Sequence, residues 1–456
     1  MESIAQQKNN GEILIRVLAL ILVFSVMNAT IFNIVLPVIS LEYHLSPSQV
    51  SWILTSYMIV YAVGSVIYGK LADQYRLKDL LTFGLLFFAI GSIVGFLANQ
   101  FWMIILARVL QAVGASVIPA TAMIIPVRYF APERRGKALG TSAMGLALGS
   151  AIGPIVAGLV TTFLNWHFLF FLSLLPLITL PLFRKYLDNE RKQAGRIDFL
   201  GGGLLAGTVT LLLLAITMGK GLLFAAFVAV LSLFVFWIQR AKEPFIQPSL
   251  FQNRKYAIGL ILVFLTNAFA FAMPFMTPLF LAKVNHLTPA LIGLIMFPGA
   301  LSSALMGRKG GQLADKKGNK LLVYTAASLI FFCYILLSSV VGVSPVFIVF
   351  ILIFGNLGQT FMSIAMSNTV SQTLAREQVG IGMGLYAMLN FISGATSTSL
   401  IGKILDKNIT EFHFNPLIES SAGYIYSNIF FVFAFLIVIV AFLYKKQFGT
   451  SRKTVD

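Results

Sequence analysis

Arg108 is the residue whose type and position in this sequence point most directly to a chemical role. It is the one basic residue inside an apolar stretch, about six residues from the nearer end, which corresponds to a depth of about 9 Å in a membrane helix. Burying a charge there costs about 3 kcal/mol on insertion scales, so the side chain should face the protein interior or a wet cavity rather than snorkel to the surface. With Gln111 one turn away on the same face, it could bind an acidic or polar ligand.

The acidic residues are equally informative because none lies deep in an apolar stretch. All 16 aspartates and glutamates fall in predicted loops, tails or helix ends. A carboxylate inside a membrane helix is the usual proton carrier and the usual partner of a cationic ligand. Its absence favours a neutral, zwitterionic or anionic ligand. Protons could bind only at the remaining titratable positions Glu42, His44, Asp73 and Asp315, although a lone loop histidine is usually an ordinary surface residue.

Polar and aromatic side chains on several apolar stretches predict a mixed binding cavity. Phe271 and Phe275 are one turn apart, which suits an apolar and permissive pocket. Each residue alone is more often lipid-facing or part of an interhelical hydrogen bond, so the hypothesis rests on the set. The predicted cavity residues are Asn28, Asn33, Tyr57, Tyr61, Arg108, Gln111, Asn267, Phe271, Phe275 and Asn390.

These residues must be positioned by membrane helices. Of the 456 residues 58% are hydrophobic and only 11% are charged, whereas a soluble domain has roughly a quarter charged residues. Uncharged runs such as 17–37 and 428–444 approach the roughly 20 residues that cross a bilayer, and in lipid a backbone satisfies its amides within a helix. We predict an all-α polytopic protein with fourteen spans, near 17–40, 50–69, 79–98, 102–125, 138–163, 167–183, 199–219, 222–239, 257–282, 288–306, 321–341, 345–372, 381–402 and 425–444.

Basic residues are distributed unequally over the two sides that these spans define. Loops and tails on the side of the N-terminus hold 28 of the 33 lysines and arginines, and the opposite loops hold four. The positive-inside rule therefore predicts a multi-pass protein of the cell (inner or plasma) membrane with both termini in the cytoplasm. The net charge of +17 then reflects topology and contact with anionic lipid, and it does not indicate a nucleic-acid partner.

Two similar segments suggest that the chain contains two related halves. Residues 69–73 read Gly-Lys-Leu-Ala-Asp and residues 311–315 read Gly-Gln-Leu-Ala-Asp, each in a predicted cytoplasmic loop followed by basic residues. A carboxylate there can cap a helix or pair with a basic residue opposite, and so latch the cytoplasmic side shut. The predicted latch residues are Gly69, Asp73, Arg76, Gly311, Asp315 and Lys316.

The copies are 242 residues apart, which is more than six spans need, so two helices are predicted to be inserted between the halves. The predicted organisation is an N-terminal six-helix half at 1–183, a cytoplasmic linker at 184–198, an inserted hairpin at 199–239, a second cytoplasmic linker at 240–256, a C-terminal six-helix half at 257–444 and a cytoplasmic tail at 445–456.

A glycine-rich stripe marks the fifth predicted span. Small residues four apart let another helix approach closely, and a proline weakens one backbone hydrogen bond and permits a bend. A pliable helix at the seam between the halves could act as a hinge, and close packing without motion is the alternative. The stripe consists of Gly145, Gly149, Gly153, Pro154 and Gly158.

Several of these segments resemble motifs of the major facilitator superfamily. The repeated loops look like its signature loop. Residues 27–37 (Met-Asn-Ala-Thr-Ile-Phe-Asn-Ile-Val-Leu-Pro) resemble the first-helix motif of its fourteen-helix drug:proton antiporter branch. Residues 108–114 (Arg-Val-Leu-Gln-Ala-Val-Gly) and the glycine stripe resemble the fourth- and fifth-helix motifs of that branch. The resemblance implies the major facilitator fold, with two six-helix halves plus two inserted helices, and transport without ATP or a cofactor.

The nearest relatives suggested by these motifs are tetracycline and multidrug exporters, in which the arginine matching Arg108 is tied to proton coupling. The family pattern usually has a carboxylate in the first helix, where this chain has Asn28 and Ala29. Ser150 and Gly394 stand where tetracycline exporters carry further acids. These departures put proton coupling and cation recognition in doubt.

Two functions stay open on the sequence. One is an exporter of drug-like amphipaths in exchange for protons, and the other is a carrier of a defined neutral or anionic metabolite with weak or no proton coupling. The third class, a membrane enzyme or scaffold, finds no support, because four histidines form no metal-ligand or Ser/His/Asp pattern. A phosphate-binding Gly-x-x-x-x-Gly-Lys-Ser/Thr loop is also missing. The expected partners are a small molecule, the lipid bilayer and, for the exporter, protons, without nucleic acid, ATP or metal.

Overall fold

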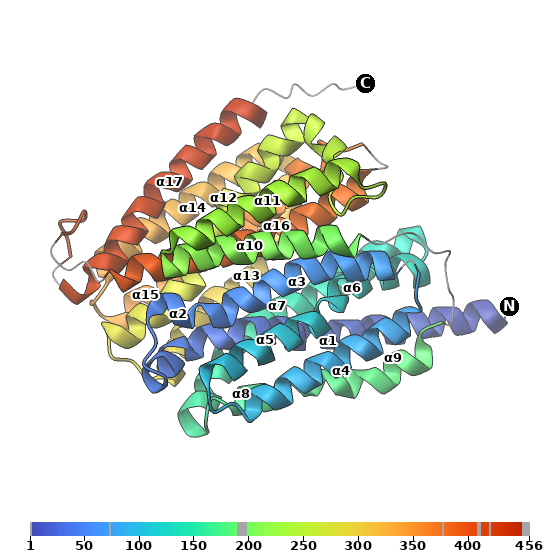
Figure 1. Cartoon of the computed structure of the whole chain (residues 1–456), viewed down its shortest axis with the longest axis horizontal. Coiled ribbons are helices and arrows are strands. Elements are labelled where there is room, and N and C mark those ends of the chain that lie inside the picture. Colours follow the sequence, from blue (N-terminus) through green and yellow to red (C-terminus); the bar gives the residue numbers. More distant parts are fainter. Residues whose placement is uncertain are drawn as a thin grey trace.

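The computed structural model describes residues 2–72, 74–188, 198–375, 378–407, 412–418 and 421–448, with the side chains of 2–9, 132, 133, 136 and 137 left out. Throughout these residues the secondary structure is helical, and the long helices lie side by side in one bundle (Figure 1). Fourteen helical segments are long and apolar enough to cross a membrane. The predicted fold class and number of spans are therefore confirmed. The latch residue Asp73 lies outside the described residues.

The bundle divides into two groups of helices joined by a hairpin. The first group comprises α1 (Glu2–Glu42), α2 (Pro47–Val50), α3 (Trp52–Leu71), α4 (Leu77–Phe96), α5 (Phe101–Ala115), α6 (Val117–Tyr129), α7 (Pro132–Phe163), α8 (Phe168–Leu172), η1 (Leu175–Thr179) and α9 (Leu180–Tyr186). The hairpin is α10 (Phe199–Met218) and α11 (Gly221–Arg240). The second group comprises η2 (Pro248–Gln252), α12 (Arg254–Lys283), α13 (Pro289–Lys317), α14 (Asn319–Val340), α15 (Pro345–Ser371), α16 (Val379–Asp406), η4 (Ser421–Gly423) and α17 (Tyr424–Phe448).

An even number of spans returns the chain to the end of the bundle at which α1 begins. We call this the inner end, because the charge distribution predicts that it faces the cytoplasm, and the opposite end the outer end. The cytoplasmic placement of the termini and the exact domain boundaries stay predictions. One apolar core cluster lies wholly within α1–α9, whereas a larger one joins residues of both groups.

The structure departs from the predicted spans at two places for local reasons. The sixth span is broken into α8, η1 and α9 around Pro176 and Pro181, which lack the N–H that would continue an α-helix. The second copy of the repeated segment is not a loop as predicted. Residues 311–315 form the last turns of α13, which ends only at Lys317 before Gly318, a residue with a positive φ of 83°.

The hairpin packs against helices of both groups. Its helix α10 packs against both α3 and α16 (Figure 1). At the inner end Gly202 lies against Phe245 and Ile67 of α3, and at the outer end the Lys403 ammonium of α16 donates to the Thr217 carbonyl at 2.9 Å. In contrast, Phe234 is the one buried residue of α11, which packs against α10 and leaves its other face exposed at the edge of the bundle.

Asp198 fastens the inner end of the hairpin. Its Oδ1 accepts from the Gly201 N–H at 2.7 Å and from the Trp237 indole at 2.9 Å, while Oδ2 accepts from the Phe245 N–H at 2.9 Å. The carboxylate therefore ties the start of α10, the end of α11 and the following linker to one point. Hydrogen bonds to a charged acceptor stabilise by about 1.5–3 kcal/mol each, without being additive.

Replacing Asp198 with alanine is expected to loosen the hairpin, because three donors lose their shared acceptor. We expect a loss of about 2–4 kcal/mol, the combined contribution of such bonds after partial compensation by water, read as a lower thermal midpoint in detergent. Glu243→Gln is the matched control, since Glu243 is an exposed carboxylate in the same linker. Equal midpoints for the two variants would contradict the anchoring role.

Candidate functional site

A cavity of about 1540 Å³ lies between the two helix groups. Its walls come from α1 and α7 on one side and from α12, α13 and α15 on the other, with Ile330 contributed by α14 and Tyr386 by α16. It extends from Pro154 and Pro274 in the middle of the bundle to Gly140 and Arg308 near the inner end. The volume exceeds the roughly 300–1,000 Å³ of ordinary ligand pockets, so it can hold a small organic molecule together with water.

The predicted cavity residues separate into two places. Asn33 and Asn267 line the cavity. Asn390 supports Asn267 from behind, because the Asn267 Nδ2 donates to the Asn390 Oδ1 at 2.6 Å. Phe271 lies against Gly394, and Phe275 is fully buried with an exposure of 0%. Phe275 is thus a packing residue in this state, since its burial leaves no ring face for a ligand.

Arg108 belongs to a closed network behind the cavity. Its Nη1 donates to the Asn28 Oδ1 at 3.0 Å and to the Gln111 Oε1 at 2.9 Å, and its Nε donates to the Ile53 carbonyl at 3.1 Å. The guanidinium lies 4.2 Å from the ring centroid of Phe32 and 4.1 Å from that of Tyr57. Arg108 is 1% exposed, so the predicted interior placement is confirmed.

The partners of Arg108 continue into further neutral groups. Asn28 donates to the Ser173 Oγ at 2.6 Å, and Gln111 donates to the Ser92 Oγ at 2.9 Å. Amides and hydroxyls therefore replace the counter-charge that a buried cation normally has. Ligand binding by Asn28, Arg108 and Gln111 stays a prediction, and in this conformation all three are buried rather than exposed to the cavity.

A row of aromatic rings connects this network to the other half. Tyr57 stacks on Tyr61 at 5.6 Å between centroids, Tyr61 meets Phe391 of α16 edge-on at 4.7 Å, and Phe391 lies 6.5 Å from Phe271. These rings link the guanidinium of Arg108 to α12, whose Asn267 lines the cavity. Tyr57 and Tyr61 thus contribute to the contact between the halves, apart from the cavity wall.

Sequence reasoning missed much of the C-terminal wall. Asn356, Gln359, Thr360 and Ser363 all line the cavity from α15. Their spacing of i, i+3, i+4 and i+7 places them on one helix face, and this polar stripe inside an apolar span was the signal that could have found them. Arg308 was missed because it follows the predicted end of its span, whereas α13 runs on as a helix beyond it.

The lining contains a single charged side chain among the described residues, that of Arg308. No acidic residue lines the cavity in that part of the chain, and Ser150 of α7 lines it where tetracycline exporters carry an acid. Gly394 has no room for one, because an added Cβ would lie 2.7 Å from the Phe271 ring. Within the described ranges no group of three or more His, Cys, Asp or Glu could hold a metal ion.

Comparison with known proteins identifies the fold family. A family model described as Major Facilitator Superfamily matches residues 18–398. The chain belongs to the Major Facilitator Superfamily. It is therefore a multi-pass membrane transporter of the secondary kind. The finer assignment to the fourteen-helix drug:proton antiporter branch stays a prediction.

Curated relatives agree with this family. The chain is 27% identical over 398 residues to the riboflavin transporter RibZ of Clostridioides difficile (strain 630), covering 85% of this chain and 86% of the relative. It is 29% identical over 302 residues to multidrug resistance protein 3 of Bacillus subtilis (strain 168), covering 63% of this chain and 59% of the relative. The solved structure of the nucleoside transporter NupG shares the fold, with a TM-score of 0.65, 13% identity and coverage of 99% of this chain and 100% of that one.

The glycine stripe of this transporter packs two helices at backbone distance, as its spacing predicts. An added Cβ at Gly149 would lie 2.5 Å from the Val23 carbonyl oxygen of α1, and Gly145 meets the Ala19 backbone of α1 in the same way. At Gly153 the added Cβ would instead meet the Thr30 side chain of α1. Gly158 instead faces the other half, where an added Cβ would lie 2.6 Å from the Pro289 oxygen. Only the outer end of the stripe is therefore at the seam between halves, while most of it joins α7 to α1, and the hinge role stays a prediction.

The predicted latch glycines make no close contact in this conformation. An added Cβ at Gly69 or Gly311 would meet nothing within 4 Å. Arg76 has a buried Nε without a hydrogen-bond partner among the described residues, and Lys316 and Asp315 are exposed. The lack of close contacts fits a conformation in which the cavity reaches the inner end. The latching role stays a prediction for the conformation in which that end is closed.

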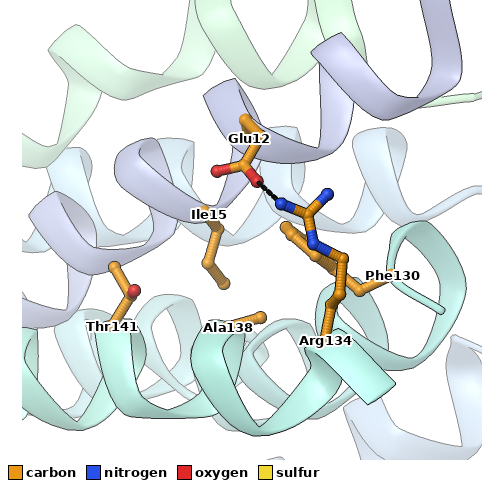
Figure 2. A pocket seen from close by; sticks show the side chains of 6 residues that line it. All are labelled: Glu12, Ile15, Phe130, Arg134, Ala138 and Thr141. Atoms are coloured by element: carbon orange, nitrogen blue, oxygen red, sulfur yellow. Dashed lines mark ion pairs between the residues drawn. The ribbon is translucent and has the colours of Figure 1, made fainter. Parts of the chain in front are cut away.

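A second and much smaller hollow lies between α1 and α7 near the inner end. Figure 2 shows Glu12 and Arg134 facing each other across it, joined by an ion pair of 3.7 Å. Both side chains are partly exposed at 34% and 46%, so the pair contributes at most about 1 kcal/mol. The hollow has a volume of about 20 Å³, enough for little more than one water, and it is not a ligand site.

Proposed function

We propose that this transporter moves uncharged or anionic amphipathic small molecules by alternating access and exports them from the side of its inner end. The observation that carries the proposal is the cavity wall, which combines apolar and amide side chains with one cation, Arg308, and no acid among the described residues. Amide groups hydrogen-bond to polar cargo without requiring a charge. A strongly cationic cargo would meet no counter-charge there.

The names of the relatives support part of this proposal. One is named a riboflavin transporter, and riboflavin is an uncharged aromatic molecule that amide side chains and an apolar wall of this kind can hold. The other is named a multidrug resistance protein, which supports export and keeps the drug exporter as the second candidate. In our proposal proton coupling is weak or absent, because a cavity carboxylate is the usual means of coupling and the described lining has none.

Transport by the purified protein in proteoliposomes tests this proposal. Riboflavin, fluorescein and ethidium serve as neutral, anionic and cationic probes of similar aromatic character, each with and without an imposed pH gradient. We expect saturable movement of the neutral or the anionic probe that does not depend on the gradient. Gradient-driven movement of ethidium alone would overturn the proposal and favour the proton-coupled drug exporter.

Arg308→Gln is expected to raise the KM for the anionic probe about tenfold, because a cavity lined by one sign of charge concentrates the opposite ion. The KM for the neutral probe should not change. Lys309→Gln is the matched control, since Lys309 is the exposed neighbour on the same helix and is absent from the cavity lining. The same KM shift in both variants would assign the effect to surface charge rather than to the cavity.

A further inference from the structure

The outer end of the bundle is closed on one side by contacts between α16 and the short helix α2, which precedes α3. The Asp406 Oδ1 at the end of α16 accepts from the backbone N–H of Ser48 at 3.0 Å. One turn earlier, Gly402 lies so close that an added Cβ would be 2.9 Å from the Pro47 oxygen and from the Ser48 Cα. A carboxylate and a glycine of one half are thus fitted to the backbone of the other.

A second contact closes the other side between α7 and α13. The backbone N–H of Ala290 donates to the Thr162 Oγ1 at 3.0 Å, and Gly158 faces the Pro289 oxygen. We call these two contacts the outer seal, which consists of Ser48, Gly158, Thr162, Ala290, Gly402 and Asp406. Alternating access requires that the outer seal opens while the inner cavity closes.

Two buried hydroxyls lie behind the outer seal without a hydrogen-bond partner among the described residues. They are the Oγ1 of Thr55 on α3 and the Oγ of Ser399 on α16, both 0% exposed. Thr55 lies seven residues after Ser48, near the start of α3, and Ser399 precedes Gly402 by one turn of α16. Both therefore lie just inward of the Ser48–Gly402 contact, on packed helices.

The inner boundary of this region is the contact of Tyr61 with Phe391, 4.7 Å between centroids. Between that aromatic contact and the outer seal, the two residues are buried on α3 and α16, which pack against each other. Buried polar groups are almost always paired, and each exception needs an explanation. A surface that is dry in one conformation and wet in another provides one, because water or cargo pairs the hydroxyls when the helices separate.

We propose that Thr55 and Ser399 line the cargo path of the outward-open state and hydrogen-bond there to water and to polar groups of the cargo. This rests on the carrier function proposed above, but not on the charge of the cargo. The two hydroxyls make the closed outer seal less stable than an apolar one, so that it can open during each cycle. They form a second polar surface, distinct from the inner cavity wall.

Cysteine labelling tests the location. Thr55→Cys and Ser399→Cys are each placed in a Cys333→Ala background, since Cys333 is the single native cysteine, and treated from outside with an impermeant cationic methanethiosulfonate. Gly402→Val, which has no room at the outer seal, opens it. We expect labelling at both positions to accelerate at least tenfold in the Gly402→Val background, and Thr121→Cys, a buried position bonded to its own helix, to stay unlabelled.

The opening itself is measured by the distance between spin labels at the exposed positions Gln49 and Lys407. A longer distance without faster labelling at Thr55→Cys and Ser399→Cys would overturn the proposal. An unchanged distance would overturn the assignment of Gly402 to the outer seal. Neither readout involves the transported compound, so a failure here is distinguishable from a wrong cargo class.

Removing the hydroxyls tests their role. The double variant Thr55→Val and Ser399→Ala keeps the shape of the interface but not its unpaired groups. We expect a higher thermal midpoint together with a turnover lowered about fivefold, because the outer seal opens less often. Unchanged turnover would show that the hydroxyls do not serve the cycle. The hydroxyl of Thr121, which is paired with the Val117 carbonyl, provides the control: Thr121→Val should neither raise the thermal midpoint nor lower the turnover.

Discussion

Arg108→Leu is expected to lower transport at least tenfold and to destabilise the protein by about 2–4 kcal/mol. The substitution leaves the Asn28 Oδ1 and the Gln111 Oε1 without the Arg108 donor, and each unpaired buried acceptor costs about 1–3 kcal/mol. The Ile53 carbonyl loses its bond from Arg108 but keeps the backbone bond within α3. Relief from burying the charge offsets part of this loss. Thermal midpoint in detergent and initial transport rate in proteoliposomes measure the two effects.

A double variant distinguishes a role of Arg108 in transport from a purely structural role. In Arg108→Leu with Asn28→Leu one orphaned acceptor is removed, and the Ser173 hydroxyl keeps its bond to the Leu169 carbonyl. We expect this double variant to recover part of the stability but none of the transport, since the guanidinium also joins α5 to α3 through its contact with the Tyr57 ring. Full recovery of transport would mean that Arg108 is only a structural residue. Arg16→Gln, an exposed arginine on α1, should change neither quantity.

Gly149→Ala is expected to destabilise the protein by about 3 kcal/mol although it adds one methyl group. Its Cβ would lie 2.5 Å from the Val23 oxygen, and a backbone carbonyl can yield only if α1 and α7 move apart. Overpacking of this kind costs about 1–3 kcal/mol or more. The measurement is the thermal midpoint in detergent.

Gly140→Ala is the control on the same helix, because an added Cβ there meets nothing within 4 Å. Alanine is the better helix former by about 1 kcal/mol, so this variant should be neutral or slightly more stable. Equal loss in the two variants would contradict close packing as the role of the stripe. Gly158→Ala, which faces the other half, should instead change the balance between conformations more than the stability.

The sequence predicted the elements of this fold because membrane helices are determined by local composition. A run of apolar residues long enough to cross the bilayer has no other way to satisfy its backbone, and all fourteen predicted spans are present. Failures occurred where composition is ambiguous. The segment at 311–315 has the glycine and charges of a loop, but it continues α13, since its backbone bonds are made within the helix.

The candidate site was predicted only in part for a related reason. Asn33 and Asn267 were found because polar residues are conspicuous in apolar spans, and both line the cavity. The same signal also selected Asn28 and Gln111, which instead pair with Arg108. Side-chain type could not distinguish an amide that faces a cavity from one that satisfies a buried cation, because both are polar groups at similar depth.

The amino-acid sequence by itself determined that this chain is a helical membrane protein and that Arg108 has no acid near it in its span. It also predicted the orientation of the chain in the membrane. These properties depend on residues close together in the chain. Only the tertiary structure decided which face each helix turns to its neighbours. It assigned neutral partners to Arg108, the one charge of the cavity wall to Arg308 and the outer seal to Gly402 and Asp406, because such contacts join residues far apart in sequence and depend on how the helices pack.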